Sequence, residues 1–229
     1  MKKRVVVSFS GGKDSMLALH RVQRSGMWEI DSLLVTLTER EKRISAHGVR
    51  HEMLSLQAES LKIPLREVWM PEAPTNDEYN ARMQEALAAA KRDGAEYVMF
   101  GDIFLEDLRV YREKMIEPTG LKPVFPLWNC DTGELLQEFL AEGFKTVLIS
   151  VDTGRLNPTF GGRVIDKEFL EDYPGEHDLC GEYGEYHTFV FDGPNFSFPI
   201  RYRLGDTRMA PDMVTKNDRY LFVDLLPEK

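Results

Sequence analysis

The sequence predicts an α/β fold, in which a parallel sheet covered by helices is joined to a second, smaller α+β domain. Through the first half of the chain, short β-branched runs alternate with stretches whose apolar residues recur at helical spacing. A glycine-containing loop joins the first run to the first helical stretch, and prolines break the pattern near residue 118. Strands that alternate with helices are typical of right-handed βαβ crossovers, which build parallel sheets.

The first domain is predicted over residues 1–117. Residues 4–9 form a β-branched run, and Leu17, Leu19 and Val22 then mark a helix that ends at Gly26. The unit repeats, with strands expected over 32–37, 65–70 and 97–100 and helices over 49–61 and 77–93. The ligand of such a sheet binds beyond the carboxyl ends of its strands.

The second domain is predicted over residues 118–229. Pro118, Gly120, Pro123 and Pro126 interrupt the pattern before a helix over 132–142 and a strand over 145–151. Gly, Pro and aromatic residues are frequent beyond residue 154. In that part we expect a helix over 166–173 and short strands over 187–191, 198–202 and 220–225.

Composition excludes several classes of protein. Of 229 residues, 42% are hydrophobic and 29% charged, which is typical of a globular protein. Lys and Arg number 29 against 38 Asp and Glu, and the net charge of −9 makes nucleic acid an unfavourable partner. The apolar run at 5–7 is too short for a signal peptide or a membrane span, so we expect a cytoplasmic protein without a membrane partner.

The most specific motif is Ser10-Gly11-Gly12-Lys13-Asp14-Ser15, between the first strand and the first helix. The glycines permit close backbone approach, so N–H groups and the positive end of the helix can surround phosphate oxygens. Lys13 adds a positive charge, the serines add hydroxyl donors, and Asp14 could hold Mg²⁺ or orient the loop. The spacing matches neither a Walker A loop nor a dinucleotide-binding fingerprint. A glycine turn that merely begins a helix is the alternative.

Four more residues are expected near the same sheet edge. Gly101 and Asp102 follow the fourth strand, and Asp102 could bind Mg²⁺ or a ribose, or could cap a helix. Arg109 and Arg112 are three apart on the following helix. They could clamp phosphates or a substrate carboxylate, or could pair with glutamates at the surface.

Residues 181–188 place Glu182, Glu185 and His187 in a glycine-containing loop that leads into a strand. Closely spaced carboxylates can bind ammonium or Mg²⁺, or can have a raised pKa suited to acid–base work. A solvated acidic loop is the alternative. His47 and His51 could share a helical face, but no third ligand is evident and a zinc site is disfavoured.

Cys130 and Cys180 are the only cysteines, and they form no C-x-x-C pair. A disulfide framework and a structural zinc are therefore not expected. The two thiols could carry sulfur, as in enzymes that thiolate tRNA. An acidic chain without a C-x-x-C pair disfavours that role.

Together these motifs resemble the diphthine–ammonia ligase family of the PP-loop ATP pyrophosphatases. The resemblance covers nearly the whole chain and rests on residues 10–15, His47-Gly-Val-Arg50, Gln57-Ala-Glu59, Ile63-Pro-Leu65, Gly101-Asp102 with Arg109 and Arg112, Phe125-Pro-Leu-Trp128, and Gly181-Glu-Tyr-Gly-Glu-Tyr-His-Thr188. It implies a Rossmann-like nucleotide domain and a smaller substrate domain with the active cleft between them. It also implies ATP with Mg²⁺, cleavage of ATP between the α and β phosphates, and an amide made from an adenylated carboxylate and ammonium.

On this interpretation each candidate residue has an expected role. The catalytic residues are Lys13, Asp14, Glu182 and Glu185, and the metal ligands are Asp14 and Asp102. ATP is held by Ser10, Gly11, Gly12, Lys13, Asp14, Ser15, His47, Gly101 and Asp102. The acceptor is held by Arg109, Arg112, Glu182, Glu185 and His187.

The acceptor itself stays open at this point. The family's acceptor is diphthine, a modified histidine of elongation factor 2, which would fit an archaeal source. Family members that make diphthamide carry Glu where this chain has His187, and the His form resembles a bacterial branch. Amidation or amide hydrolysis in cobalamin salvage is therefore an alternative, and a non-catalytic ATP-binding module is a second one. A homodimer is a further open expectation.

Overall fold

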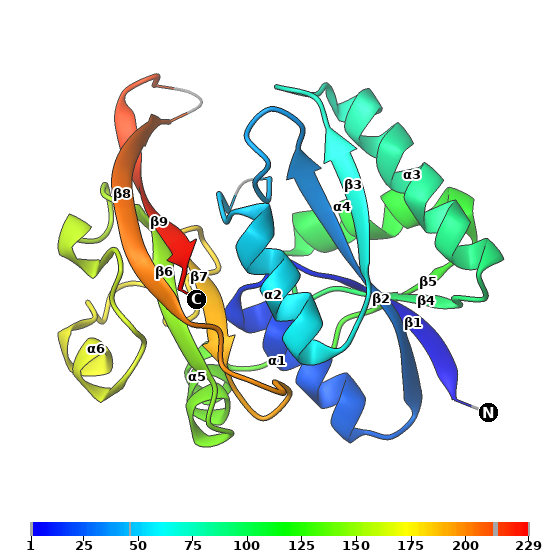
Figure 1. Ribbon diagram of the computed structural model, residues 1–229, viewed down its shortest axis with the longest axis horizontal. Helices are drawn as coiled ribbons and strands as arrows, with labels where there is room; N and C mark the ends of the chain where they lie inside the picture. The colour runs from blue at the N-terminus through cyan, green and yellow to red at the C-terminus, as the bar shows by residue number, and fades with distance from the viewer. Residues whose placement is uncertain (1, 46, 213–214, 229) are drawn as a thin grey trace.

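The computed structural model describes residues 2–45, 47–212 and 215–228 and contains two sheets (Figure 1). The first sheet has the strand order β3-β2-β1-β4-β5, and every neighbouring pair is parallel. Its strands are β1 (Lys3–Ser8), β2 (Trp28–Thr38), β3 (Leu65–Met70), β4 (Tyr97–Met99) and β5 (Lys122–Val124). The predicted parallel α/β domain is confirmed.

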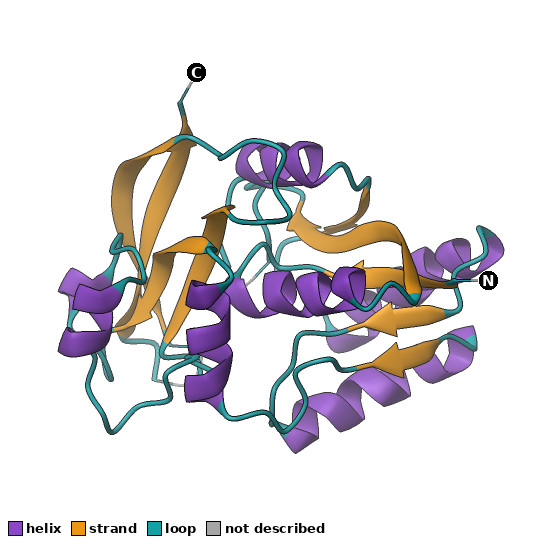
Figure 2. Cartoon of the chain, turned by 90° about the horizontal axis from the view of Figure 1, so that it is seen from below, coloured by secondary structure: helices purple, strands orange, loops and turns teal. Residues whose placement is uncertain are grey.

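Helices cover both faces of this sheet (Figure 2). They are α1 (Lys13–Arg24), α2 (His51–Leu61), α3 (Asn76–Arg92) and α4 (Glu106–Ile116), followed by a short 3₁₀ helix at Glu117–Thr119. Side chains of β1 alternate between the faces: Val5 and Val7 pack in the core that contains α1 and α2, whereas Val6 packs in the core with α3 and α4. This two-sided burial explains the continuous apolar run of the first strand.

The second sheet is antiparallel, with the strand order β7-β6-β9-β8. Its strands are β6 (Lys145–Asp152), β7 (Tyr186–Asp192), β8 (Tyr202–Pro211) and β9 (Asp218–Pro227), with helices α5 (Thr132–Ala141) and α6 (Lys167–Asp172) and a 3₁₀ helix at Pro158–Phe160. The smaller α+β domain is therefore confirmed. None of the described helices is long and apolar enough to cross a membrane.

One apolar core joins the two sheets. Val7 and Met16 of the first domain belong to the same buried cluster as Leu148 and Phe189 of the second. Between the sheets, backbone contacts add to this packing, since Val190 N–H donates to Gly11 O at 3.0 Å. The loop between β1 and α1 consequently lies at the junction of the two domains.

Two strands differ from the prediction. The expected strand at 198–202 is wrong, because the backbone of Phe198 hydrogen-bonds to the Ser60 hydroxyl on α2 instead of to a neighbouring strand. The pairing begins at Tyr202 and runs to Pro211, with a bulge between Leu204 and Thr207. β5 was not predicted, because Pro123 was interpreted as a break, although an edge strand tolerates a residue without an N–H. The first sheet thus extends beyond residue 117.

Candidate active site

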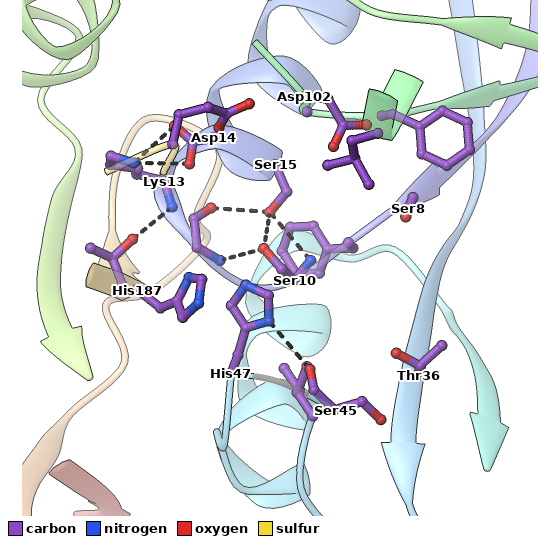
Figure 3. Close-up of a pocket in the computed structure, with 18 of the residues that line it drawn as sticks. Ser8, Ser10, Lys13, Asp14, Ser15, Thr36, Ser45, His47, Asp102 and His187 are labelled. Atoms are coloured by element: carbon purple, nitrogen blue, oxygen red, sulfur yellow. Dashed lines mark hydrogen bonds and ion pairs between the residues drawn. The ribbon is translucent and has the colours of Figure 1, made fainter. Parts of the chain in front are cut away.

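A cavity of about 380 Å³ lies at the carboxyl ends of the first sheet's strands and opens between the domains (Figure 3). Its walls come from the end of β1 and the following loop, the end of β2, residues 44–47, residues 100–112, and residues 180–188. A ligand site at this edge is the usual arrangement in parallel α/β sheets. The volume falls in the range of small-molecule sites.

The loop of residues 10–15 is ordered by its own serines. The hydroxyls of Ser10 and Ser15 lie 3.1 Å apart, and Gly12 N–H donates to the Ser10 hydroxyl at 3.3 Å. Gly11 has a φ of 77°, which glycine adopts without strain. At the start of α1, the N–H groups of Asp14 and Ser15 donate to no atom of the described residues. The helix start therefore offers free donors and a positive dipole end to an anion.

Lys13 and Asp14 form an ion pair at the cavity wall. Lys13 Nζ lies 2.9 Å from Asp14 Oδ2 and also donates to the Cys180 carbonyl oxygen, over the ring of Tyr186. Burial alone would lower the pKa of Lys13, but Asp14 and its other acidic neighbours outweigh burial and raise that pKa. Lys13 is therefore positively charged at neutral pH and lies at the start of α1.

Gly101 and Asp102 approach the same loop from β4. A Cβ atom at Gly101 would lie 2.9 Å from Ser15 N and 3.0 Å from the Asp14 carbonyl carbon, so only glycine fits there. Asp102 lines the cavity, and burial raises the pKa of its carboxyl, although Arg112 partly opposes this. Among the described residues, Asp102 Oδ2 is buried without a hydrogen-bond partner, as is Arg112 Nε, and these atoms lie 3.6 Å apart.

Arg109 and Arg112, predicted to act together, point to different places. Arg112 lines the cavity. Arg109 does not: its guanidinium stacks on Phe125 and Trp128 at 5.1 and 4.6 Å and pairs with Glu113 at 2.9 Å. Arg109 thus packs outside the cavity in which it was expected, and its substrate contact stays a prediction, while Trp128 is a packing aromatic.

The two glutamates of the acidic loop, Glu182 and Glu185, also lie in different places. Glu182 faces the cavity and accepts a hydrogen bond from Ile103 N–H at 2.9 Å, and burial raises the pKa of its carboxyl to about 7. Glu185 is not a cavity residue; it is 1% exposed and pairs with Arg155 at 2.9 Å. Gly181 and Gly184 have φ values of 69° and 82°, and the left-handed turn at Gly184 lies between the two glutamates. Glu185 thus lies outside the cavity in which it was expected, paired with Arg155, and its catalytic and substrate-binding roles stay predictions.

His47 and His187 meet across the domain junction. Both line the cavity, and their ring centroids are 4.4 Å apart (Figure 3). His47 Nδ1 lies 3.3 Å from the Ser45 carbonyl oxygen. Burial lowers the pKa of His47, and burial together with His47 and Lys13 holds the pKa of His187 well below its usual value. Two uncharged imidazoles thus line this wall at neutral pH. His51 instead pairs with Glu67 at 2.6 Å and lies away from the cavity.

The cysteines do not suit sulfur transfer. Cys180 is buried and donates to the Thr132 carbonyl oxygen at 3.3 Å, and burial raises the pKa of its thiol to about 12. A thiol with that pKa is not a nucleophile at neutral pH. Cys130 lies on the Arg21 side of α1, with its sulfur 3.4 Å from Arg21 Nη1.

Several cavity residues were missed. Ser8, Thr36, Ser45, Tyr79 and Thr188 all line the cavity. Ser8 ends β1 and Thr36 lies near the end of β2, so polar residues at the carboxyl ends of predicted strands were a usable signal. Nothing in the local pattern of Tyr79, on α3, indicates a site.

Comparisons with known proteins match most of this chain to one family. Residues 3–123 match the family described as diphthamide synthase N-terminal domain, and residues 131–212 match the diphthamide synthase C-terminal domain. The diphthine–ammonia ligases of Bos taurus and Homo sapiens are 28% and 27% identical over 222 residues, covering 86% of this chain and 82% of each relative. A solved structure described as a predicted subunit of tRNA methyltransferase from Methanocaldococcus jannaschii is 16% identical, with a TM-score of 0.45 over 84% of this chain and 98% of that one. The two family matches span most of the sequence, and the chain belongs to the diphthamide synthase family.

Proposed function

We propose that this chain is an ATP-dependent ligase that forms an amide from a carboxylate and ammonia and releases AMP and pyrophosphate. One observation carries the proposal: a single cavity joins the free N–H groups at the start of α1 and Lys13 to the carboxylates of Asp14, Asp102 and Glu182. The name of the curated relatives, diphthine–ammonia ligase, supports the same chemistry.

ATP would place its phosphates at the start of α1. The amides of Asp14 and Ser15 would donate to phosphate oxygens, and Lys13 would offset the charge that develops on the departing pyrophosphate. In the first step a carboxylate oxygen of the acceptor attacks the α phosphorus, and the bond between the α phosphorus and the bridging oxygen to the β phosphorus breaks. The acceptor then carries AMP as an activated acyl group.

Mg²⁺ fits the residues present. Asp14 and Asp102 both line the cavity, and Asp102 Oδ2 is buried with no hydrogen-bond partner among the described residues, although it forms an ion pair with Arg112 at 3.6 Å. In that part of the chain no three His, Cys, Asp or Glu side chains are grouped to hold a metal alone, so phosphate oxygens and water would complete the coordination. Bound Mg²⁺ would screen the negative charge of the phosphates.

Ammonia would enter on the side of Glu182. Ammonium must lose a proton before its nitrogen can attack the acyl carbon and displace AMP. A carboxyl with a pKa of about 7 can accept that proton near neutral pH. Arg112 lines the cavity, where its Nε pairs with Asp102 at 3.6 Å, and the remaining donors of its guanidinium would hold the acceptor carboxylate.

The acceptor belongs to the class of diphthine, a carboxylate carried on a side chain. Its remaining atoms would lie against His47 and His187, because these two uncharged rings line the cavity where the domains meet. His187 is where this chain departs from the pattern of diphthamide-making relatives, so His187→Glu is expected to change acceptor preference without changing where ATP is cleaved.

The test is a balanced product assay. The protein is incubated with Mg²⁺, ammonium, ATP labelled at the γ position, and elongation factor 2 carrying diphthine. We expect label in pyrophosphate, with AMP and amide formed in equal amounts and no turnover when ammonium or acceptor is omitted. Label in orthophosphate together with ADP would refute cleavage between the α and β phosphates. ATP binding without any turnover with diphthine or other carboxylates would leave a non-catalytic module.

A further inference from the structure

The carbonyl group of Gly11 in the nucleotide loop is held by two separate elements. Gln57, on α2, is fully buried, and its Nε2 donates to Gly11 O at 2.9 Å and to Val190 O at 2.6 Å. Val190 N–H, on β7 of the second domain, also donates to Gly11 O, at 3.0 Å. A single side-chain amide therefore ties α2, the loop and β7 together.

The orientation of the Gln57 amide is fixed by these acceptors. Its Oε1 has no hydrogen-bond partner among the described residues, and a Cβ atom at Gly11 would lie 2.6 Å from it. A flipped amide would direct Oε1 at two carbonyl oxygens, which repel it. A buried acceptor without a partner is unfavourable. The Gln57 amide therefore holds Gly11 in place through Nε2, although its own Oε1 has no hydrogen-bond partner among the described residues.

Thr188, on β7, holds the loop from the other end. Its hydroxyl oxygen accepts a hydrogen bond from Lys13 N–H at 3.0 Å. Its carbonyl oxygen lies 3.0 Å from the position of a Cβ atom at Gly12. The first amide of α1 is therefore engaged by the second domain, whereas the next two amides, of Asp14 and Ser15, have no acceptor among the described residues.

We propose that Gln57 and Thr188 are positioning residues for ATP, which set the shape of the loop at 10–15 jointly from α2 and β7. This inference rests on the proposed function for the identity of the anion. It assigns the second domain a part in nucleotide binding, in addition to the acceptor. Ser60 provides a matched control: it is also fully buried on α2, and it binds the backbone of Phe198 without contacting the loop.

The experiment compares Gln57→Met, Thr188→Val, Thr188→Ser and Ser60→Ala with the wild-type chain. Affinity for Mg·ATP is measured by calorimetry, thermal stability by calorimetric melting, and hydrogen exchange of the amides of residues 10–15 without nucleotide by mass spectrometry. Gln57→Met and Thr188→Val are expected to weaken Mg·ATP binding about tenfold, because a loop displaced by a fraction of an ångström misplaces its donors. Both are expected to speed exchange in the loop.

Ser60→Ala is expected to lower thermal stability while leaving ATP affinity and loop exchange unchanged. Thr188→Ser, which keeps the hydroxyl, is expected to keep wild-type ATP affinity and loop exchange. If Gln57→Met and Thr188→Val bind Mg·ATP like the wild type, or if Ser60→Ala loses as much affinity as they do, the inference is overturned. Should Gln57→Met fail to fold, the two Thr188 variants decide. A wild-type chain that binds no Mg·ATP would contradict the proposed function, and the exchange data would still decide whether these two residues fix the loop.

Discussion

Gly101→Ala should damage the nucleotide site without adding any polar or charged group. The new Cβ atom would lie 2.9 Å from Ser15 N, 3.0 Å from the carbonyl carbon of Asp14 and 3.1 Å from its oxygen. Ordinary contacts begin at 3.4 Å, so the end of β4 and the start of α1 must separate by about 0.5 Å. Because the obstructing atoms are backbone, no side-chain rotation can relieve the contact.

The size of the effect follows from that displacement. Overpacking of this kind costs about 1–3 kcal/mol of folding free energy. In a chain of this length each kcal/mol lowers the melting temperature by about 2–4 °C. A misplacement of about 1 Å can cost about 100-fold in rate, so half that displacement predicts a loss of about tenfold in turnover. The same movement displaces the free amides of Asp14 and Ser15 and should weaken Mg·ATP binding.

Gly175→Ala is the matched control. Gly175 is exposed, and a Cβ atom there meets nothing within 4 Å. This variant should keep wild-type stability, Mg·ATP affinity and pyrophosphate release. If Gly101→Ala melts several degrees lower yet binds and turns over ATP like the wild type, the loop is not the nucleotide site. If Gly101→Ala changes nothing, the close approach of β4 to α1 is wrong.

Three further predictions concern charged residues at and beside the cavity. Lys13→Ala and Asp14→Ala should abolish turnover with the fold intact, because each loses about 1.5–3 kcal/mol of charge-assisted contact in binding and more in the transition state. Full activity of both variants in a pyrophosphate assay would remove the loop from the mechanism. Glu182→Gln should remove the rise in turnover with pH near 7. Because the folded-state pKa of Glu182 is raised from 4.5 to about 7, wild-type stability falls as pH rises from 4.5 to 7. Glu182→Gln should therefore melt at a higher temperature than the wild type at pH 8. A lower melting temperature there would contradict the burial argument. Glu185→Gln should cost about 1–3 kcal/mol of stability by weakening the pair with Arg155 and spare Mg·ATP affinity, whereas a loss of affinity as large as that of Lys13→Ala would place Glu185 in the site.

The fold of the first domain could be predicted well because the patterns that indicate its strands and helices lie within short stretches of the sequence. A parallel strand buried on both faces is a continuous apolar run, and the residues that follow it must lie at the sheet's ligand-binding edge. Ser10, Asp102 and Glu182 were predicted for that reason or by resemblance, and all three line the cavity. Their individual roles stay predictions until the variants are measured.

The structures of β8 and of the segment around Phe198 were predicted wrongly because both depend on partners distant in the sequence. β8 contains Gly205, Asp206 and Pro211, which favour turns, and it is a strand because β9 supplies its hydrogen bonds. The segment around Phe198 has strand-forming residues, but Ser60 takes its backbone groups. In both cases a partner distant in sequence decides the structure, and local propensity carries no information about that partner.

Side-chain direction was the least predictable property of the site. Arg109 and Arg112 are three apart on one helix, yet Arg109 stacks on Trp128 outside the cavity and Arg112 lines the cavity. In helices and strands a fixed period relates the directions of neighbouring side chains. A loop with two left-handed glycines within four residues has no such period. Glu182 therefore meets the substrate cavity and Glu185 meets Arg155, although the sequence presents them as one acidic pair. In the proposed function only Glu182 of these two residues takes part in amide formation, while the backbone of Glu185 holds the loop against β6, where Asp152 N–H donates to the Glu185 carbonyl oxygen.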